Sequence, residues 1–147
     1  MSARLAIGDG DMGKVQALLE RLLADTGCAA VVLSGRDGAS LATAGAARAL
    51  DVVSMTALAA GGFSSTAPLA RLLGEREFSV LIHEGVRQSL HVSAVDDATI
   101  LVAVFDERTT VGMVRVFARE AAAKLATILD ETRAGSGHAR RSGPGET

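Results

Sequence analysis

Apolar residues recur along the chain with two periodicities, which together predict three helices and five strands. Spacings of three or four residues predict amphipathic helices over 14–26, ending at Gly27, and over 109–132, capped by Asp106 or Thr109. Short apolar runs, some continuous and some alternating with polar residues, predict strands over 28–34, 39–44, 78–83, 89–95 and 99–105. Hairpin-length links between strands favour a mainly antiparallel five-stranded sheet in an α/β (α+β) domain, with element order α-β-β-α-β-β-β-α.

The remaining helix is predicted from Asp51, a good N-cap, to Gly74, a good helix stop. Its interior is rich in Ala, Gly and Ser, although a glycine inside a helix costs about 1 kcal/mol relative to alanine. Small side chains offset that cost when they let two helices approach closely. We interpret this helix as a partner-binding element whose candidate contact residues are Met55, Leu58, Gly61, Gly62, Ser64, Ser65, Pro68, Leu69, Arg71 and Leu72.

Two other interpretations of this helix stay open. Residues 52–70 carry no charge and are long enough to span a membrane, but serines, threonines, glycines and a proline leave few bulky apolar side chains. A plain core helix of a monomer would show the same periodicity. Pro68 cannot donate a hydrogen bond to the carbonyl of Ser64, so we expect the helix to bend or loosen there.

Length and composition indicate one domain with flexible ends. The 147 residues suffice for a single core, which we place at 14–132, with a flexible lead-in at 1–13 and a disordered basic tail at 133–147. The net charge of −2 gives no electrostatic footprint for nucleic acid, and four Phe without Tyr or Trp argue against stacking on bases. We therefore expect protein or small-molecule partners, no nucleic acid and no membrane span.

The chain offers little catalytic chemistry. Gly8 to Lys14 matches G-x-x-x-x-G-K, but Val15 follows where Ser or Thr should meet magnesium, so a flexible lead-in is the better interpretation. The single Cys28 is interpreted as a buried structural thiol, and without an export signal we expect a cytoplasmic protein. His83 and Glu84 are neighbours on a strand and point to opposite faces. We expect no catalytic site, no metal and no cofactor, which favours a binding module.

Several short segments carry a family resemblance. The element order, together with Leu58-Ala59-Ala60-Gly61, Leu72-Leu73-Gly74-Glu75, His83-Glu84-Gly85, Ser89-Leu90 and VFDERT over 104–109, resembles the roadblock/LC7 family and, within it, the bacterial MglB-like branch. The likeness runs from Val15 to about Leu129. It implies a sheet with the second helix on one face and the other two helices on the opposite face. It also implies a homodimer paired through the second helix and the next strand, at Phe78, Val80 and Ile82.

The resemblance further implies a function. MglB-like dimers bind a small Ras-like GTPase, MglA, and accelerate its GTP hydrolysis by remodelling its switch loops, in the polarity control of motile bacteria. Placement at a cell pole and contacts with other polarity proteins would follow. The alternative is a roadblock scaffold that links a GTPase to a polarity complex without stimulating hydrolysis. Arg71, Arg76 and Arg87 are candidates for an inserted catalytic arginine, and solvated rim charges are the competing interpretation.

Two departures from the branch are visible. Pro68 stands where MglB-like helices tend to carry a small residue, and the end of the chain lacks an acidic and apolar extension.

Overall fold

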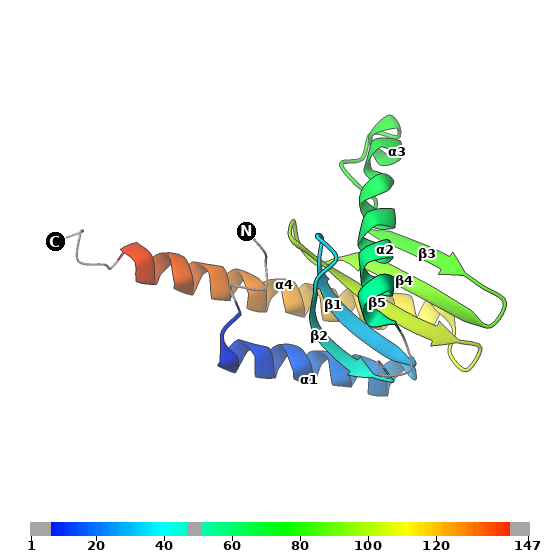
Figure 1. Cartoon of the computed structure of the whole chain (residues 1–147), viewed down its shortest axis with the longest axis horizontal. Helices are drawn as coiled ribbons and strands as arrows, with labels where there is room; N and C mark the ends of the chain where they lie inside the picture. The colour runs from blue at the N-terminus through cyan, green and yellow to red at the C-terminus, as the bar shows by residue number, and fades with distance from the viewer. Residues whose placement is uncertain (1–6, 47–50, 142–147) are drawn as a thin grey trace.

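The computed structural model describes residues 7–46 and 51–141. It contains one five-stranded antiparallel sheet flanked by helices (Figure 1). The strand order is β2-β1-β5-β4-β3, so β2 and β3 are the edge strands. The predicted fold class is confirmed, with the second helix divided in two. In chain order the elements are α1 (Asp9–Thr26), β1 (Ala30–Gly35), β2 (Ser40–Gly45), α2 (Val52–Ser65), α3 (Ala67–Leu72), β3 (Val80–Glu84), β4 (Gln88–Ala94), β5 (Thr99–Asp106) and α4 (Val111–Arg141).

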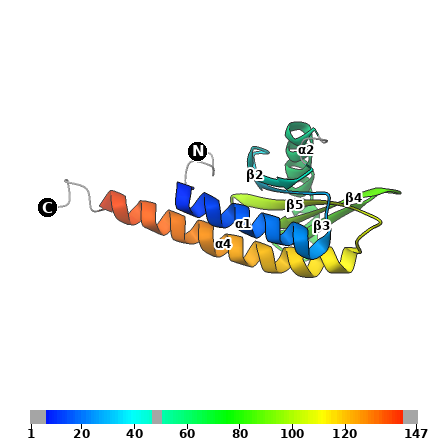
Figure 2. The ribbon, with the colours of Figure 1, turned by 90° about the horizontal axis from the view of Figure 1, so that it is seen from below.

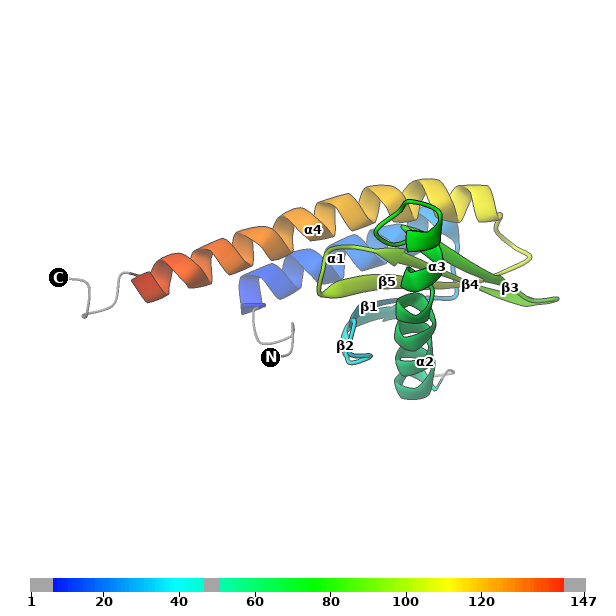
Figure 3. The same ribbon diagram turned by 90° about the horizontal axis from the view of Figure 1, so that it is seen from above.

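The helices cover the two faces of the sheet unequally. α1 and α4 lie side by side on one face (Figure 2), and α2 crosses the other (Figure 3). The core under α1 and α4 is built from large aliphatic side chains, among them Leu19, Leu33, Leu101 and Leu125. The core under α2 is smaller and consists of Val32, Ala59, Ala60, Phe63, Val92, Ile100 and Val102. Strand residues alternate between these two cores, as the pleat requires.

α1 begins earlier than the sequence predicts. The helix starts at Asp9, so a flexible lead-in is wrong over 9–13, whereas 1–6 lie outside the described residues. Asp9 and Asp11 in the first turn favour a helix because carboxylates stabilise its positive end. The hydroxyl of Thr132 on α4 also donates to the Asp11 carboxylate and ties this turn to the neighbouring helix. Since most of the G-x-x-x-x-G-K segment is helical, it does not form a phosphate loop.

The second predicted helix is interrupted at Thr66. Asp51 caps α2 as expected, since its carboxylate accepts a hydrogen bond from the Ser54 amide at 3.0 Å. The hydroxyls of Ser65 and Thr66 turn back to the carbonyls of Gly62 and Phe63, at 2.9 and 2.8 Å, and close the end of α2. Pro68 sits in the first turn of α3, where its missing amide hydrogen costs nothing. The expected bend is present, but it precedes the proline.

α4 differs from its prediction at both ends. Thr110 is the N-terminal cap, because its hydroxyl accepts from the Met113 amide at 3.2 Å, so the expectation of Asp106 or Thr109 was wrong. The helix continues to Arg141 instead of giving way to a disordered tail at 133, while 142–147 lie outside the described residues. The Arg133 guanidinium donates to Asp96 at 2.8 Å, so tertiary contacts extend past the predicted end.

The strands match their predicted positions closely. Each of the five begins and ends within two residues of its prediction. One shift affects a candidate site residue, because β3 begins at Val80 and Phe78 therefore precedes it.

Candidate functional site

Five apolar side chains of α2, of α3 and of the residue that follows α3 are exposed to solvent. We call them the outer row: Val53, Leu58, Leu69, Leu72 and Leu73, with exposed fractions from 54% to 83%. Exposed apolar residues are ordinary when scattered, but a group concentrated on one helical run marks an interaction surface. α3 carries much of this row past the strands (Figure 1).

The inner side of α2 explains why the outer row is left uncovered. The buried residues of α2 are Thr56, Ala59, Ala60 and Phe63. Because a helix packs on a sheet with one side only, the side chains on its other side stay exposed. Most candidate residues from the sequence are on the exposed side: Leu58, Gly61, Ser64, Ser65, Pro68, Leu69, Arg71 and Leu72. Met55 and Gly62 are half-buried. A plain core helix would bury its apolar stripe, so this interpretation does not fit α2.

Gly61 and Gly62 face open space within this chain. A methyl group added at either position would meet no atom within 4 Å outside its own helix turn. Packing inside the subunit therefore gives no reason for glycine here.

β3 is an edge strand and follows α3 along the chain. It pairs with β4 only, and its other edge pairs with no strand among the described residues. Val80 and Ile82 are half-buried, as is Phe78 in the preceding loop. An open edge of this kind can pair with a strand of another chain.

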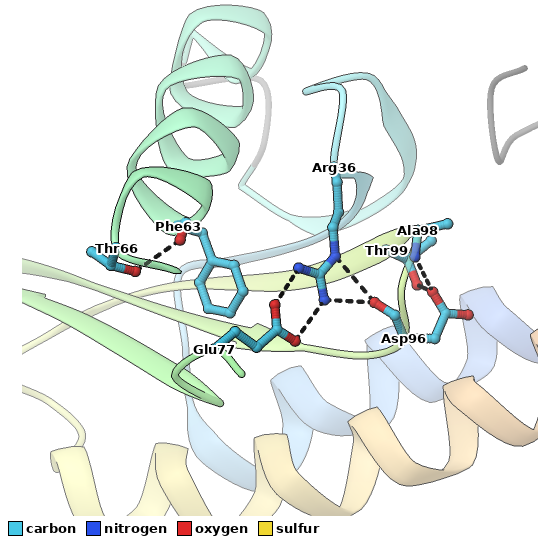
Figure 4. Close-up of polar contacts among 7 residues, drawn as sticks. All are labelled: Arg36, Phe63, Thr66, Glu77, Asp96, Ala98 and Thr99. Carbon is cyan, nitrogen blue, oxygen red and sulfur yellow. Dashed lines mark hydrogen bonds and ion pairs between the residues drawn. The ribbon is translucent and has the colours of Figure 1, made fainter. Parts of the chain in front are cut away.

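Arg36 ties the loop before β3 to the rest of the sheet (Figure 4). Its guanidinium donates two hydrogen bonds to the Glu77 carboxylate, at 2.6 and 3.1 Å, and two to the backbone carbonyl of Asp96, at 3.1 and 2.7 Å. It also lies 5.4 Å from the centre of the Phe63 ring at the end of α2. Hydrogen bonds from Arg36 hold the pKa of Glu77 below its ordinary value. We call this group the Arg36 latch.

Sequence reasoning missed the latch. Arg36 stood in a predicted turn between Gly35 and Gly38, and nothing in that turn identifies a partner so far along the chain. The signal that could have raised attention is a single arginine inside a tight turn, a position that usually carries short polar residues.

The three candidate arginines do not converge on one point. Arg71 and Arg76 line an open cavity of about 600 Å³ beside the latch, together with Asp97. Arg87 lies in the turn between β3 and β4, outside that cavity. All three are exposed, as the rim-charge interpretation requires. Arg36 is held by its partners and is not free to insert elsewhere.

The other singled-out residues have structural roles. Cys28 is buried, as expected of a structural thiol, and burial raises the pKa of its thiol. His83 is exposed on the rim of a shallow depression next to Met55. Across residues 7–46 and 51–134, no three metal-binding side chains lie close enough together to hold an ion.

The run Val52–Leu72, which comprises α2 and α3, is the one stretch of the described structure long and apolar enough to cross a membrane. Its mean hydropathy is 1.2 and 22% of its most apolar window is buried. Length and composition alone are weak evidence for a span. The interruption at Thr66 and the buried contact of Phe63 with the sheet favour a helix that packs on its own domain.

Comparison with known proteins gives information on the chain as a whole. Residues 14–105 match the model of the Roadblock/LC7 domain. A solved structure described as MglB with a tetrameric arrangement is 32% identical, with 86% of this chain and 95% of that chain covered, and a TM-score of 0.81. Myxococcus xanthus MglB is also 32% identical, with the same coverage and a TM-score of 0.79. The gliding protein MglB from Thermus thermophilus is 32% identical, with 85% of this chain and 95% of that chain covered, and a TM-score of 0.80. No curated protein matches the chain.

Proposed function

The chain belongs to the Roadblock/LC7 domain family, and on that premise we propose that it is a homodimeric regulator that binds a small Ras-like GTPase and stimulates GTP hydrolysis. One observation carries the proposal: an outer row of apolar side chains lies beside glycines with open space and an unpaired edge strand. The likeness to MglB structures at 32% identity supports the same conclusion.

Dimer formation uses the two elements together. β3 of one copy pairs with β3 of another through Val80 and Ile82, with Phe78 adjoining, and the sheets become continuous. The two α2–α3 segments then pack near each other across the same boundary, where Gly61 and Gly62 permit close approach. A stable interface of this kind buries about 1,200–2,000 Å². Burying even part of the outer row contributes to it, since each fully buried leucine is worth about 1.5–3 kcal/mol.

The GTPase docks on the platform that the paired α2–α3 segments create. Its contact residues are drawn from Met55, Leu58, Gly61, Gly62, Ser64, Ser65, Pro68, Leu69, Arg71 and Leu72, divided between the partner and the second copy. Activation is a population shift, because the dimer binds the hydrolysis-competent switch conformation more tightly, by about 1.4 kcal/mol for each tenfold gain in rate. No catalytic group of this chain is required. The biological setting is bacterial polarity or gliding motility, in the cytoplasm and at a pole through partners.

A non-activating scaffold is the alternative function. It uses the same surface and binds the GTP form without changing its hydrolysis rate. Single-turnover GTP hydrolysis by the purified small GTPase, with and without this protein, separates the two. Acceleration supports the regulator, whereas tight GTP-dependent binding without acceleration leaves the scaffold.

Leu58→Glu tests the surface itself. The side chain is 75% exposed in the single subunit, so a carboxylate there does not disturb folding, but it introduces a charge into the interface. Val116→Glu is the matched control, since Val116 is an exposed apolar residue of α4, on the opposite face of the sheet. Sedimentation equilibrium should find monomers for Leu58→Glu and dimers for Val116→Glu. A wild-type monomer at all concentrations, or equal assembly of both variants, contradicts the proposal.

A further inference from the structure

A second cavity lies on the face of the sheet opposite to α2, between strands β3 and β4 and helix α4. Its volume is about 550 Å³. Two polar side chains of β4 line it, His91 and Ser93, which are 1% and 4% exposed. Neither ring nitrogen of His91 nor the hydroxyl of Ser93 has a hydrogen-bond partner among the described residues. Buried polar groups are nearly always paired, so three unpaired atoms in one cavity call for an explanation.

Two arginines of α4 line the same cavity. Arg115 and Arg119 are four residues apart and therefore lie on the same side of the helix, one turn from each other. Neither forms an ion pair with any carboxylate in the part of the chain that the structure describes. The lining contains no acidic side chain. Its polar part thus offers hydrogen-bond donors and positive charge without a compensating anion.

The rest of the lining is apolar. Phe78, Val80, Val95, Ala122 and Ala123 contribute most of it. The volume is in the range of small-molecule sites. A ligand here therefore has an anionic end, held by the arginines, His91 and Ser93, and an apolar body.

We propose that this cavity binds a phosphate group carried by a small organic molecule. A phosphate presents three acceptor oxygens and close to two negative charges, which suits two guanidinium groups, a hydroxyl and an imidazole N–H that line one cavity. Burial and the charge of Arg115 lower the pKa of His91, so its imidazole is neutral near pH 7 and supplies one donor. The proposal is independent of the GTPase, because the outer row lies on the α2 face.

Phenyl phosphate is the probe, since it combines a phosphate with an apolar ring. It is titrated into the full-length, isotopically labelled protein in its solution assembly, at constant ionic strength, and followed by NMR. Inorganic phosphate and phenol serve as the two halves of the probe. The expected result is saturable binding that shifts the signals of His91 and Ser93, tighter for phenyl phosphate than for inorganic phosphate and absent for phenol.

The arginines are tested with a charge-matched pair of variants. Arg115→Gln/Arg119→Gln should weaken phenyl phosphate binding at least about tenfold, which corresponds to about 1.4 kcal/mol. Arg21→Gln/Lys124→Gln removes the same charge from α1 and α4 outside the cavity and should leave binding within about twofold.

Three results overturn the proposal. The first is no saturation by phenyl phosphate up to about 10 mM, a dissociation constant that corresponds to a binding free energy of only about 3 kcal/mol. The second is equal affinity of the two double variants for phenyl phosphate, and the third is equal affinity of the wild-type protein for phenol and phenyl phosphate. If the arginine variant does not fold, Ser93→Ala replaces it. This variant removes one donor and should weaken binding several-fold, and unchanged affinity there contradicts the site. Absence of binding because a second copy fills the cavity also counts against it.

Discussion

The two faces of the sheet are covered in different ways. On one face, α1 and α4 lie side by side and bury large side chains such as Leu19 and Leu125 completely. On the other face, α2 contributes a small contact through Ala59, Ala60 and Phe63, while the outer row stays in solvent. The first face is a finished core. On the second face the outer row is not covered by any helix of the described chain, and the proposed second copy covers it.

This difference is the basis of the proposed interface. Both faces are apolar, so hydrophobicity alone does not separate them. What separates them is whether the helices present are sufficient to cover the apolar residues. α2 contacts β1, β2 and β5, whereas the open edge belongs to β3 at the end of the sheet order, so the two uncovered elements are separate features of one subunit.

The largest contrast is expected from leucine truncations on the two faces. Leu125→Ala removes a fully buried side chain under α4 and should lower the free energy of unfolding by about 2–5 kcal/mol. Leu58→Ala, at a 75% exposed position, should change it by no more than about 0.5 kcal/mol when the protein is dilute enough to be monomeric. Urea unfolding at low concentration measures both. A comparable loss from both variants would mean that the α2 face is already complete in one subunit.

The Arg36 latch holds the loop that leads from the incomplete face into β3. Arg36→Ala removes four charge-assisted hydrogen bonds and should lower the free energy of unfolding by about 1.5–3 kcal/mol. Arg36→Lys keeps the positive charge but lacks the planar guanidinium, so its free energy of unfolding should lie between those of Arg36→Ala and the wild type. Amide hydrogen exchange should increase over 66–79 before the rest of the chain. Uniform exchange with no loss of stability would show that the latch contributes nothing.

Alanine at the two glycines should have opposite effects on the subunit and on the dimer. Gly61→Ala and Gly62→Ala meet no atom within 4 Å, so each should stabilise the dilute monomer by about 0.5–1 kcal/mol through helix propensity. The same methyl groups should separate the paired helices and weaken the dimer. Unfolding of the dilute protein and sedimentation at high concentration measure the two effects. A variant that stabilises both states would place the glycines outside the interface.

His91 is a buried titratable side chain on the α4 face, and it should make stability depend on pH. Burial lowers its pKa in the folded state, whereas the unfolded chain binds a proton near the ordinary value of 6.5. Between those two values the unfolded state holds more protons, so stability should fall as pH decreases below about 6.5. One group contributes at most about 1.4 kcal/mol per pH unit.

The comparison uses wild type and His91→Gln, in buffer without phosphate. His91→Gln should reduce the slope between pH 7 and pH 5. Equal slopes in wild type and His91→Gln would assign the dependence to other groups.

Local patterns predicted the regular elements well because their causes are local. The continuous apolar run of β5 and the Leu periodicity of α1 are properties of short segments, and Gly27 ends α1 with a φ of 74° that glycine adopts readily. The ends of α1 and α4 were missed because they depend on each other. Asp11 and Thr132 are far apart in sequence and meet only when the two helices are side by side.

The candidate interface was only partly predictable. Sequence singled out the segment from Asp51 to Gly74 because its small residues are unusual in a helix. It did not tell which stripe faces the sheet, since Leu58 and Phe63 are both apolar and both occur at helical spacing. The structure buries Phe63 and exposes Leu58.

The amino-acid sequence by itself determined the type and order of the elements of this protein, apart from the division of the second helix into α2 and α3, and a family resemblance, because these follow from the side-chain pattern within each segment. The tertiary structure alone decided what remains uncovered: the outer row on α2 and α3, the open edge of β3, and the cavity that brings His91 together with Arg115. These features depend on which elements distant in sequence pack against each other, and the periodicity of one segment does not specify such tertiary contacts.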